Sequence, residues 1–220
     1  KLAPKLAEGC VLVANPDFFD SNSKLLNKFG LTSPPPQDLG PDRRADLLPV
    51  LIVVDYNDKS PSRAILLNRR TGYLLGDLEQ PVLEKFCIQP LYFGGPDPSG
   101  LDMLHLCRGV ENSKCIGDGL YWGGDPEQAQ TAMEQNTERV ITGFDFKFFV
   151  QNTEFKKGEL QKLIDNETFY VINVAKQVFF KSRDRAGTRR AKPLWTEIME
   201  LLGGEYITIK ERFYKSGEEY

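Results

Sequence analysis

The strongest constraint on the fold is an almost unbroken apolar run from residue 48 to 56. Such a run predicts a strand buried on both faces, because a strand with one solvated face alternates apolar and polar residues. Residues 57–61 then supply turn-forming side chains, and residues 63–68 return as a second strand. The sequence therefore predicts a β-hairpin whose first strand is covered on both sides.

Strands predominate in the rest of the chain as well. Short apolar or aromatic runs predict strands at residues 9–14, 91–93, 119–122, 144–150, 169–175 and 178–180. Residues 101–107 are ambiguous, because their apolar side chains fit both the two-residue period of a strand and the stripe of a helix. The elements do not alternate as strict βαβ units, so their order indicates a single α+β domain.

Helices are expected between and after these strands. Residues 23–29 and 160–164 fit short helices. Another begins at residues 125–127, Asp-Pro-Glu. The aspartate can accept a backbone hydrogen bond as N-cap, the proline sacrifices no helical bond there, and the glutamate complements the helix dipole. The last helix is expected within residues 193–204, where a proline opens it and two glycines end it.

Two segments are expected to lie outside the core. Residues 20–48 are rich in polar side chains and contain Pro34, Pro35 and Pro36. Consecutive prolines favour an extended, solvated backbone, so this segment is interpreted as a surface insertion in a single domain. Residues 210–220 are charged and predict a loose C-terminal tail.

Size and charge limit the class of protein. A chain of 220 residues can bury a core without the help of a disulfide or a metal. Its net charge of −3 argues against nucleic acid as the main partner, because proteins that coat nucleic acid carry a basic excess. No apolar run approaches the length of about 18 residues that a transmembrane helix needs, and no secretory signal is visible. Because the chain starts at Lys1, we expect a processed or truncated product whose targeting peptide is gone.

The four cysteines predict free thiols. Cys10 and Cys87 have apolar neighbours in the sequence, so both are expected to be buried thiols in a reducing compartment. His105, Cys107 and Cys115 could be three zinc ligands, but a fourth ligand at a usable spacing is missing. We therefore predict no metal site and no cofactor.

Catalytic chemistry would depend on His105, the only histidine. A hydrolase would combine it with Asp118 or Asp125, which bracket a glycine-rich segment and could face each other across a cleft. The alternative interpretation assigns the two acids to a turn and a helix cap, and the imidazole to a partly buried site with a backbone partner. The glycine pairs at 94–95 and 123–124 match no phosphate-binding loop and are interpreted as turn residues.

A cationic loop precedes the last predicted helix. Five basic residues fall within ten positions: Arg183, Arg185, Arg189, Arg190 and Lys192. Such a loop could contact RNA, an acidic protein or a lipid head group, or it could be an ordinary solvated loop.

Several stretches form an ordered set that covers nearly the whole chain. They lie at residues 9–16, 65–69, 91–96, 104–105, 116–125, 146–150, 158–160 and 194–206, and include the sequences LLNR, FGGP and GLYWGGD. Together they resemble the AlgH/YqgE-like family, and the last stretch is similar to its plant and algal branch. The resemblance implies an α+β fold with a bifurcated mixed sheet and a small β-barrel surrounded by helices. It also favours a strand at residues 101–107 and implies no settled enzymatic activity.

Two motifs depart from the family pattern. Where the family has Asn-Arg-Pro-Thr, residues 68–71 are Asn-Arg-Arg-Thr. Where it has Gly-Tyr-Ala-Gly-Trp, residues 151–155 are Gln-Asn-Thr-Glu-Phe, so the glycines and the tryptophan are gone. If the family binds a small ligand at the second motif, we expect this chain to have lost that site.

These observations favour a non-catalytic binding, scaffold or accessory protein of a larger plastid assembly. It would bind protein partners through the cationic loop and Pro34, Pro35 and Pro36. The resemblance to the plant branch implies the chloroplast stroma or the stromal face of the thylakoid. Two alternatives stay open: a hydrolase that uses His105 with Asp118 or Asp125, and an accessory protein that contacts RNA through residues 183–192.

Overall fold

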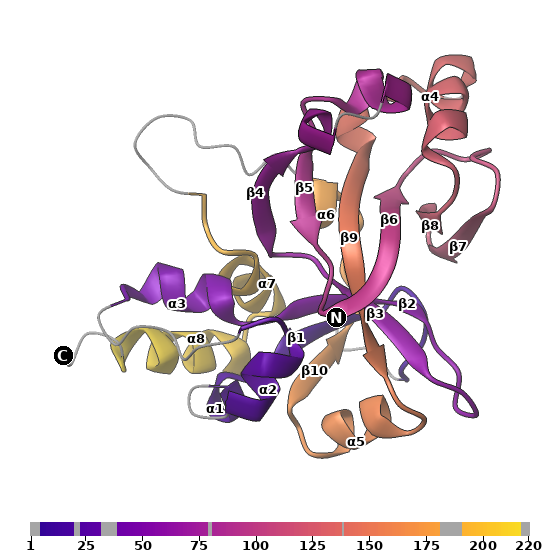
Figure 1. Ribbon diagram of the computed structural model, residues 1–220. Helices are drawn as coiled ribbons and strands as arrows, with labels where there is room; N and C mark the ends of the chain where they lie inside the picture. Colours follow the sequence, from indigo (N-terminus) through magenta and orange to yellow (C-terminus); the bar gives the residue numbers. More distant parts are fainter. Residues whose placement is uncertain are drawn as a thin grey trace.

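The structure is a computed structural model that describes residues 5–19, 23–31, 39–78, 81–137, 139–180 and 191–216. The described chain is a mixed α+β domain, in which a curled, mostly antiparallel half-barrel sheet is surrounded by helices (Figure 1). This confirms the predicted fold class.

Ten strands form the sheet within the described residues. They are β1 Val11–Ala14, β2 Val50–Asp55, β3 Ser62–Leu66, β4 Arg70–Leu74, β5 Pro90–Phe93, β6 Asp97–His105, β7 Ser113–Gly117, β8 Leu120–Gly123, β9 Phe146–Phe155 and β10 Phe169–Ile172. The main path runs β10-β1-β2-β3-β9-β6-β8-β7, and β4 and β5 branch from it. Residues 101–107 therefore contain the end of a strand, as the family resemblance implied.

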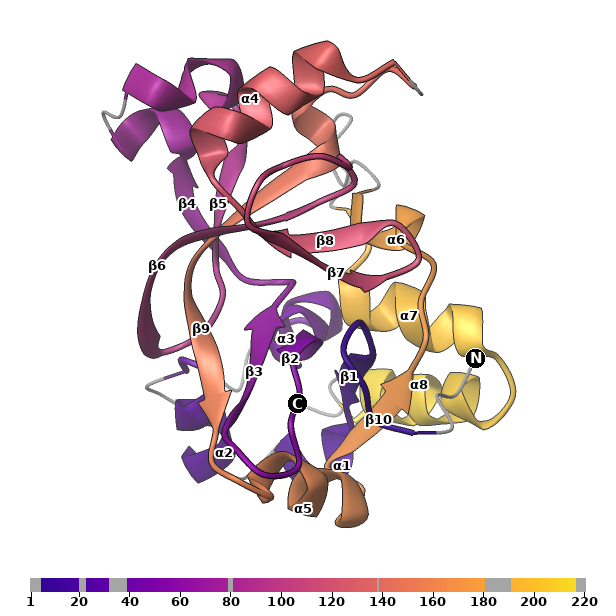
Figure 2. The same cartoon turned by 90° about the vertical axis from the view of Figure 1, so that its right-hand side faces the viewer.

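Helices cover the sheet from several sides. The α-helices are α1 Pro16–Phe19, α2 Ser23–Lys28, α3 Pro41–Leu47, α4 Pro126–Gln135, α5 Glu159–Asp165, α6 Gln177–Phe180, α7 Leu194–Leu202 and α8 Glu205–Lys215. The 3-10 helices are η1 Leu75–Leu78, η2 Pro81–Phe86 and η3 Gly143–Asp145. Figures 1 and 2 show α3, α7 and α8 gathered beside the lower half of the sheet, with α4 at the opposite end.

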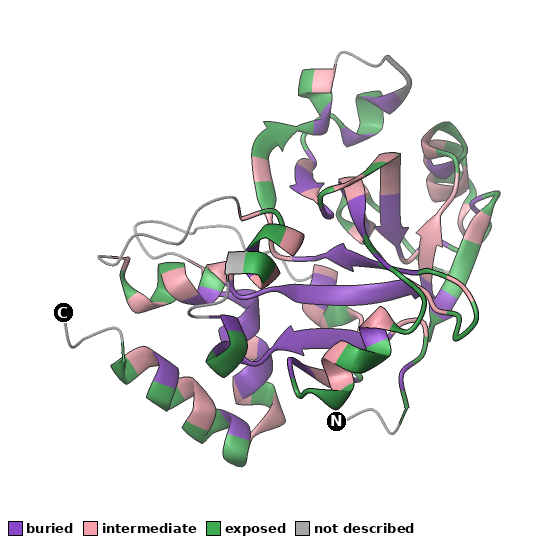
Figure 3. Cartoon of the chain, turned by 60° about the horizontal axis from the view of Figure 1, so that its bottom comes forward, coloured by how far each residue is buried: buried purple, intermediate pink, exposed green. Residues whose placement is uncertain are grey.

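The predicted hairpin is confirmed at the centre of the molecule. β2 pairs antiparallel with β3 on one side and with β1 on the other. Residues 50–54 of β2 are all buried, so both faces of this strand are covered, as its apolar sequence requires (Figure 3).

The sheet divides at β9, which makes it bifurcated. One edge of β9 pairs along its length with β6, while the opposite edge pairs with β5 over residues 148–150 and with β3 over residues 153–155. The pairing with β5 is parallel, so the sheet is mixed. At the fork the backbone N–H of Gly94 donates to the carbonyl of Val150, and Gln151 has a φ of 65° although it is not a glycine.

The fork separates two apolar cores. The larger core lies around β1, β2 and β3 and includes Trp195 from α7 and Phe213 from α8. The smaller core lies beneath η2 and α4 and includes Phe146 and Phe148. Because side chains alternate along a strand, Phe149 of the same strand enters the larger core instead.

Two predictions about secondary structure are wrong. Residues 178–180 belong to the helical turn α6 and not to a strand, because a three-residue apolar run is too short to distinguish the two. Residues 210–215 continue helix α8, and only the last four residues, 217–220, lie outside the described residues. Tyr206, Ile209 and Phe213 of α8 recur at helical spacing and pack against the core, while charged side chains cover the outer face.

The segment 20–48 is more deeply packed than a surface insertion. Phe29 of the turn after α2 is fully buried and contacts the rings of Phe19 and Phe169 at 5.8 and 5.5 Å between centroids. Ala45 of α3 is also fully buried. The described parts of this segment therefore complete the larger core, whereas Pro34, Pro35 and Pro36 lie outside the described residues.

All four cysteines are free thiols, but their burial differs from the prediction for one of them. Cys10 and Cys107 are buried, and burial raises the pKa of both thiols. Cys87 is exposed, because the chain turns after η2 so that Phe86 points inward and Cys87 outward. Across the described residues, no three His, Cys, Asp or Glu side chains cluster as metal ligands would. No helix in the described part of the chain has the length and apolar character needed to cross a bilayer.

Candidate functional site

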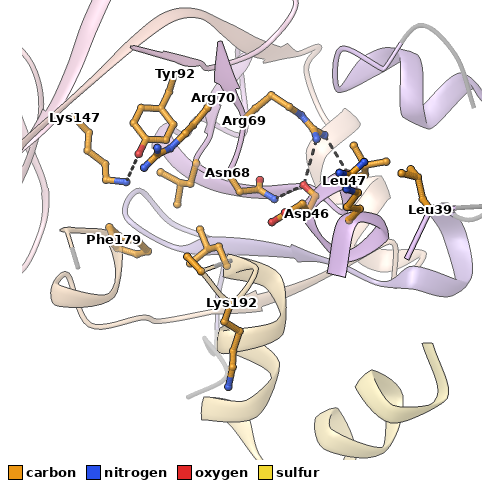
Figure 4. Close-up of a pocket in the computed structure, with 14 residues that line it drawn as sticks. Leu39, Asp46, Leu47, Asn68, Arg69, Arg70, Tyr92, Lys147, Phe179 and Lys192 are labelled. Carbon is orange, nitrogen blue, oxygen red and sulfur yellow. Dashed lines mark hydrogen bonds between the residues drawn. The ribbon is translucent and has the colours of Figure 1, made fainter. Parts of the chain in front are cut away.

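A pocket of about 460 Å³ lies where α3 and the segment after β3 face β5, β9, α6 and α7 (Figure 4). This volume is within the range of about 300–1,000 Å³ that is typical of small-molecule sites. The lining residues are Leu39, Arg43, Asp46, Leu47, Leu67, Asn68, Arg69, Arg70, Tyr92, Lys147, Phe179, Ala191, Lys192 and Leu194.

Strand alternation sets the polar face of the pocket. In β5, Leu91 enters the smaller core, so its neighbour Tyr92 points to the opposite face. In β9, Phe146 and Phe148 enter the smaller core, so Lys147 between them points to the pocket. Arg70 is the direct partner of Tyr92 in the pairing of β4 with β5. Three separate strands thus bring Arg70, Tyr92 and Lys147 together.

Tyr92 is held between two cations. The ammonium of Lys147 donates to the Tyr92 hydroxyl at 3.3 Å and lies 4.5 Å from the centre of its ring. The guanidinium carbon of Arg70 is 5.8 Å from the same ring centre. Burial by itself would raise the pKa of Tyr92, but the charges of Lys147 and Arg70 together outweigh it and lower the pKa. Two basic side chains therefore lie beside the Tyr92 hydroxyl at this end of the pocket.

The side chain of Asn68 ties α3 to the sheet. Its Nδ2 donates to the carbonyls of Asp46 and Leu48 at 3.1 and 2.9 Å, and its Oδ1 accepts from the N–H of Val50 at 3.1 Å. These are backbone groups at the end of α3 and the start of β2, which the helix and the sheet leave without partners of their own. Asn68 thereby fixes one wall of the pocket.

Arg69 acts on the same helix end. Its two terminal nitrogens donate to the carbonyls of Asp46 and Leu47 at 3.3 and 3.1 Å. A cation at a helix C-terminus is favourable, because the last carbonyls carry partial negative charge. Burial lowers the pKa of Arg69 to about 10, and the charge of Asp46 opposes this effect. The guanidinium thus stays protonated at neutral pH.

Removing the Asn68 amide is expected to loosen this wall. We expect Asn68→Ala to lower the free energy of unfolding by about 2 kcal/mol, because the buried N–H of Val50 and two carbonyls lose their partner. Urea unfolding followed by circular dichroism measures the change. The exposed Asn27 of α2 provides a matched control, and Asn27→Ala should shift the stability by less than about 0.5 kcal/mol. Equal effects of the two substitutions would contradict the role assigned to Asn68.

Basic side chains outnumber acidic ones among the described lining residues. Five are basic, Arg43, Arg69, Arg70, Lys147 and Lys192, and one, Asp46, is acidic. Lys192 forms an ion pair with Glu200, and Figure 4 shows its side chain directed away from Tyr92. Arg70 and Lys147 are therefore the cations that face the Tyr92 end.

His105 lies elsewhere, at the end of β6. It is fully buried and stacks between the rings of Tyr121 and Phe146, at centroid distances of 5.6 and 5.3 Å. Its Nε2 lies 3.2 Å from the carbonyl of Gly123, which can only accept, so Nε2 carries the proton. Burial lowers the pKa of His105 to about 4, although the carbonyl of Gly123 and the backbone of Cys107 act in the opposite direction. The imidazole is therefore neutral at pH 7.

One of the two acids proposed as its partners has its carboxylate engaged at a helix start. The side chain of Asp125 caps α4, since its Oδ1 accepts from the N–H groups of Glu127 and Gln128 at 2.7 and 3.2 Å. This confirms the predicted helix start. The backbone carbonyl of Asp118 accepts from Lys176 at 2.7 Å. His105, Asp118 and Asp125 are not among the described residues that line the pocket beside Tyr92. A hydrolase that uses them stays a prediction.

The predicted partner-binding residues are mostly outside the described chain. Arg183, Arg185, Arg189 and Arg190 fall there, together with Pro34, Pro35 and Pro36. Lys192 is described and lines the pocket. Residues 151–155, the altered family motif, form the end of β9 and do not line the pocket.

Sequence reasoning did not identify the pocket. One signal was visible: the family proline that follows Asn-Arg is replaced by Arg70. This replacement places a cation beside Tyr92. Tyr92 and Lys147 carried no signal of their own, because each lies within an aromatic strand sequence that predicts only a strand.

Comparison with known proteins places this fold in a family. The AlgH-like family model (DUF179) matches residues 49–207. The UPF0301 protein of Chlorobium luteolum is 24% identical over 208 residues, covering 93% of this chain and 90% of the relative. The UPF0301 protein of Chlorobaculum tepidum is 27% identical over 165 residues, covering 73% of this chain and 80% of the relative. These relatives are bacterial.

Two solved structures share the fold. The crystal structure of protein DIP2367 from Corynebacterium diphtheriae superposes with a TM-score of 0.63 at 16% identity, covering 96% of this chain and 94% of that one. The solution structure of AlgH from Pseudomonas aeruginosa gives a TM-score of 0.54 at 14% identity, covering 82% and 84%. Since the family model spans most of the chain and the same architecture recurs in AlgH itself, this protein belongs to the AlgH-like family.

Proposed function

We propose that this chain is a non-catalytic binding protein that takes up an anionic ligand in the pocket beside Tyr92. The observation that carries the proposal is the charge of the described lining residues, five of which are basic and one acidic, in a chain whose net charge is −3. A local cationic concavity attracts anions even when the whole protein is acidic, because low-dielectric walls concentrate the field.

The composition of the lining supports binding over hydrolysis. The described lining residues include no histidine, cysteine or serine, so they supply no Ser-His or Cys-His pair. Two of its hydrogen-bonding side chains, Asn68 and Arg69, are occupied in holding α3. Rigid walls and concentrated positive charge are what a binding site needs.

Calorimetric titration with inorganic phosphate tests the proposal. We expect saturable binding at one site, with an affinity that falls about tenfold between low and physiological ionic strength, because salt screens the attraction. A triple substitution, Arg43→Gln with Arg70→Gln and Lys147→Gln, should abolish the heat of binding while the melting temperature stays near that of the parent. If the affinity for phosphate is unchanged both at physiological ionic strength and in the triple variant, the proposal is overturned.

The same proposal includes where in the cell the protein acts and in what assembly. The protein would act as an accessory subunit of a larger plastid assembly, in the chloroplast stroma or on the stromal face of the thylakoid. The similarity of residues 194–206 to the plant and algal branch supports this, as does the cationic sequence of residues 183–192. Fractionation of intact chloroplasts, followed by sedimentation at low salt, should find the protein in a species much heavier than its own 24.9 kDa. A purely monomeric, cytosolic protein would contradict it.

A further inference from the structure

Exposed apolar side chains gather where β4, η2 and η3 meet, at the end of the molecule that lies uppermost in Figure 1. This apolar patch consists of four side chains that are 44–64% exposed: Tyr73 and Leu74 of β4, Ile88 of the turn after η2, and Phe144 of η3. They are four of the eight large apolar side chains that are exposed among the described residues. Single exposed apolar residues are normal, but a gathered set marks a contact with another molecule.

Backbone contacts hold the three segments of the apolar patch together. The N–H of Leu75 donates to the carbonyl of Gln89 at 2.8 Å, which places the end of β4 beside the turn after η2. A Cβ built on Gly143 would lie 3.0 Å from Nε2 of the same Gln89, which places η3 there too. The exposed residues directly adjoin these contacts in the sequence, so the patch forms one surface.

The segments that carry the patch are firmly anchored. Leu75, Phe86 and Phe146 each lie within two residues of a patch residue, and all three are buried in the smaller core. Docking a partner on a surface that is already ordered loses little conformational entropy. The patch is therefore preorganised for binding.

The backbone beside the patch argues against an extended peptide as the occupant. A peptide that adds a strand to a sheet needs N–H groups that lack partners along the edge. At the end of β4, however, the N–H of Tyr73 donates to Oγ1 of Thr71 at 3.1 Å, and the N–H of Leu74 donates to Oδ2 of Asp77 at 2.7 Å. The occupant must therefore contact the side chains and not the edge of the strand.

The charges around the patch fit a second copy of the chain. Both signs occur there, since Asp77 and Glu84 are exposed acids and Lys85 and Arg139 are exposed bases. Arg139 pairs with the residue next to Phe144. A two-fold axis sets the rim of one copy against the same rim of the other, and only a rim with both signs can pair with itself. An anionic membrane, in contrast, would repel the two acids.

The size of the patch fits the same occupant. The largest apolar patch on a typical monomer covers about 300–600 Å². A stable dimer buries about 800 Å² on each partner, with an apolar centre and a polar rim. We propose that the apolar patch is the interface of a homodimer, in which a second copy of the chain docks about a two-fold axis. None of the four patch residues is among the described residues that line the pocket, so the dimer does not depend on ligand binding there.

Sedimentation velocity of the whole chain over a range of concentrations tests the proposal. We expect the mass to rise from 24.9 kDa toward twice that value, with a dissociation constant on the order of 10 μM, since a small interface binds weakly. Raising the salt concentration from about 0.1 to about 0.5 M should change this constant by less than about threefold, because the centre of the contact is apolar. A mass that stays at 24.9 kDa up to about 200 μM overturns the proposal.

Ile88→Glu locates the interface, and Leu201→Glu is its matched control. Both side chains are aliphatic and almost equally exposed, at 63 and 64%, but Leu201 belongs to α7 and lies outside the patch. We expect Ile88→Glu to weaken the dimer at least about tenfold, because association would remove a carboxylate from water. Phe144→Glu should have the same effect from a different segment, while Leu201→Glu should associate like the parent. Thermal melting should find all three variants folded, since substitutions at exposed positions change stability little.

Cys87 reports on the same surface without any substitution. It is an exposed thiol next to Ile88, whereas Cys115 is an exposed thiol of β7. We expect alkylation of Cys87 by iodoacetamide to slow at least about threefold when the protein concentration is raised well above the dissociation constant, because the reaction needs an accessible thiolate. The rate at Cys115 should stay the same.

The outcomes separate the possible occupants of the patch. A dimer that forms equally well in Ile88→Glu, or that leaves Cys87 as reactive as in the monomer, uses another surface and overturns the proposal. A chain that stays monomeric but co-sediments with phosphatidylcholine vesicles, and loses this binding in Ile88→Glu, assigns the patch to a membrane and overturns it as well. Dimerisation that Ile88→Glu and Phe144→Glu both weaken, with protection of Cys87 alone, supports it.

Discussion

Replacing Gly95 by alanine is expected to lower the free energy of unfolding by about 3 kcal/mol or more. A Cβ at this position would lie 2.2 Å from the carbonyl oxygen of Asn152 and 2.2 Å from Oγ1 of Thr153, far inside van der Waals contact. The backbone φ of 154° also disfavours a side chain there. Because Asn152 and Thr153 belong to β9 at the point where the sheet divides, the clash would push apart the strands that join the two cores.

Denaturant unfolding of Gly95→Ala beside Gly100→Ala tests this expectation. Gly100 lies in β6, and a Cβ built on it meets no atom within 4 Å. Gly100→Ala should therefore leave the stability unchanged or raise it slightly, since alanine restricts the unfolded chain. If both variants unfold at the same denaturant concentration, the close approach at the fork does not constrain the fold.

Acidification is expected to destabilise the protein through its only histidine, by about 3 kcal/mol between pH 6.5 and pH 4. Burial lowers the pKa of His105 from 6.5 to about 4 in the folded state. Between these two values the unfolded chain binds a proton that the folded chain does not bind. The free energy of unfolding therefore falls as the pH is lowered through this window, and the contribution of His105 is complete above it.

His105→Phe isolates the contribution of this residue. Phenylalanine can keep the stacking between Tyr121 and Phe146, but it cannot titrate. The variant should lose the hydrogen bond to the carbonyl of Gly123 and show a flatter dependence of unfolding free energy on pH than the parent. Carboxyl groups act equally in both proteins, so the difference between the two curves belongs to His105. Parallel curves from pH 6.5 to 4 would contradict the lowered pKa. The imidazole resonances of the parent provide a direct measurement by NMR titration.

The buried state of His105 also bears on catalysis. A general base must reach the proton that it abstracts, and its pKa should lie near the working pH. A neutral imidazole stacked between two aromatic rings, with its protonated nitrogen on a backbone carbonyl, is better suited to packing than to proton transfer. The pH dependence of stability and the ligand titrations therefore address different parts of the molecule.

Two of the family motifs have a clear structural role in this fold. The Asn-Arg pair at 68–69 holds the end of α3 to the sheet, and the glycine pair at 94–95 lets β5 approach β9. Gln151 adopts a left-handed φ of 65° although it is not a glycine. The pairing of β9 with β3, β5 and β6 on either side of this residue determines the path of its backbone.

Local order could be predicted from the sequence because it depends on neighbouring residues. The apolar run of β2 predicted a strand that is covered on both faces. Asp125, followed by Pro126, predicted the N-terminus of a helix, because an aspartate side chain can accept hydrogen bonds from the free N–H groups there. The tail was misjudged because its charges hid the helical spacing of Tyr206 and Phe213, whose burial depends on the neighbouring helix α7. Sequence motifs also led to the correct family and fold class.

The pocket, in contrast, was decided by tertiary structure alone. Arg70, Tyr92 and Lys147 are far apart in the chain, and each sits in a strand whose sequence predicts only a strand. They meet because β5 pairs with β4 on one side and with β9 on the other, and because strand alternation turns all three side chains to the same face. Strand pairing brings distant residues together, and a periodicity that reads only a few neighbouring residues carries no information about which strands will pair.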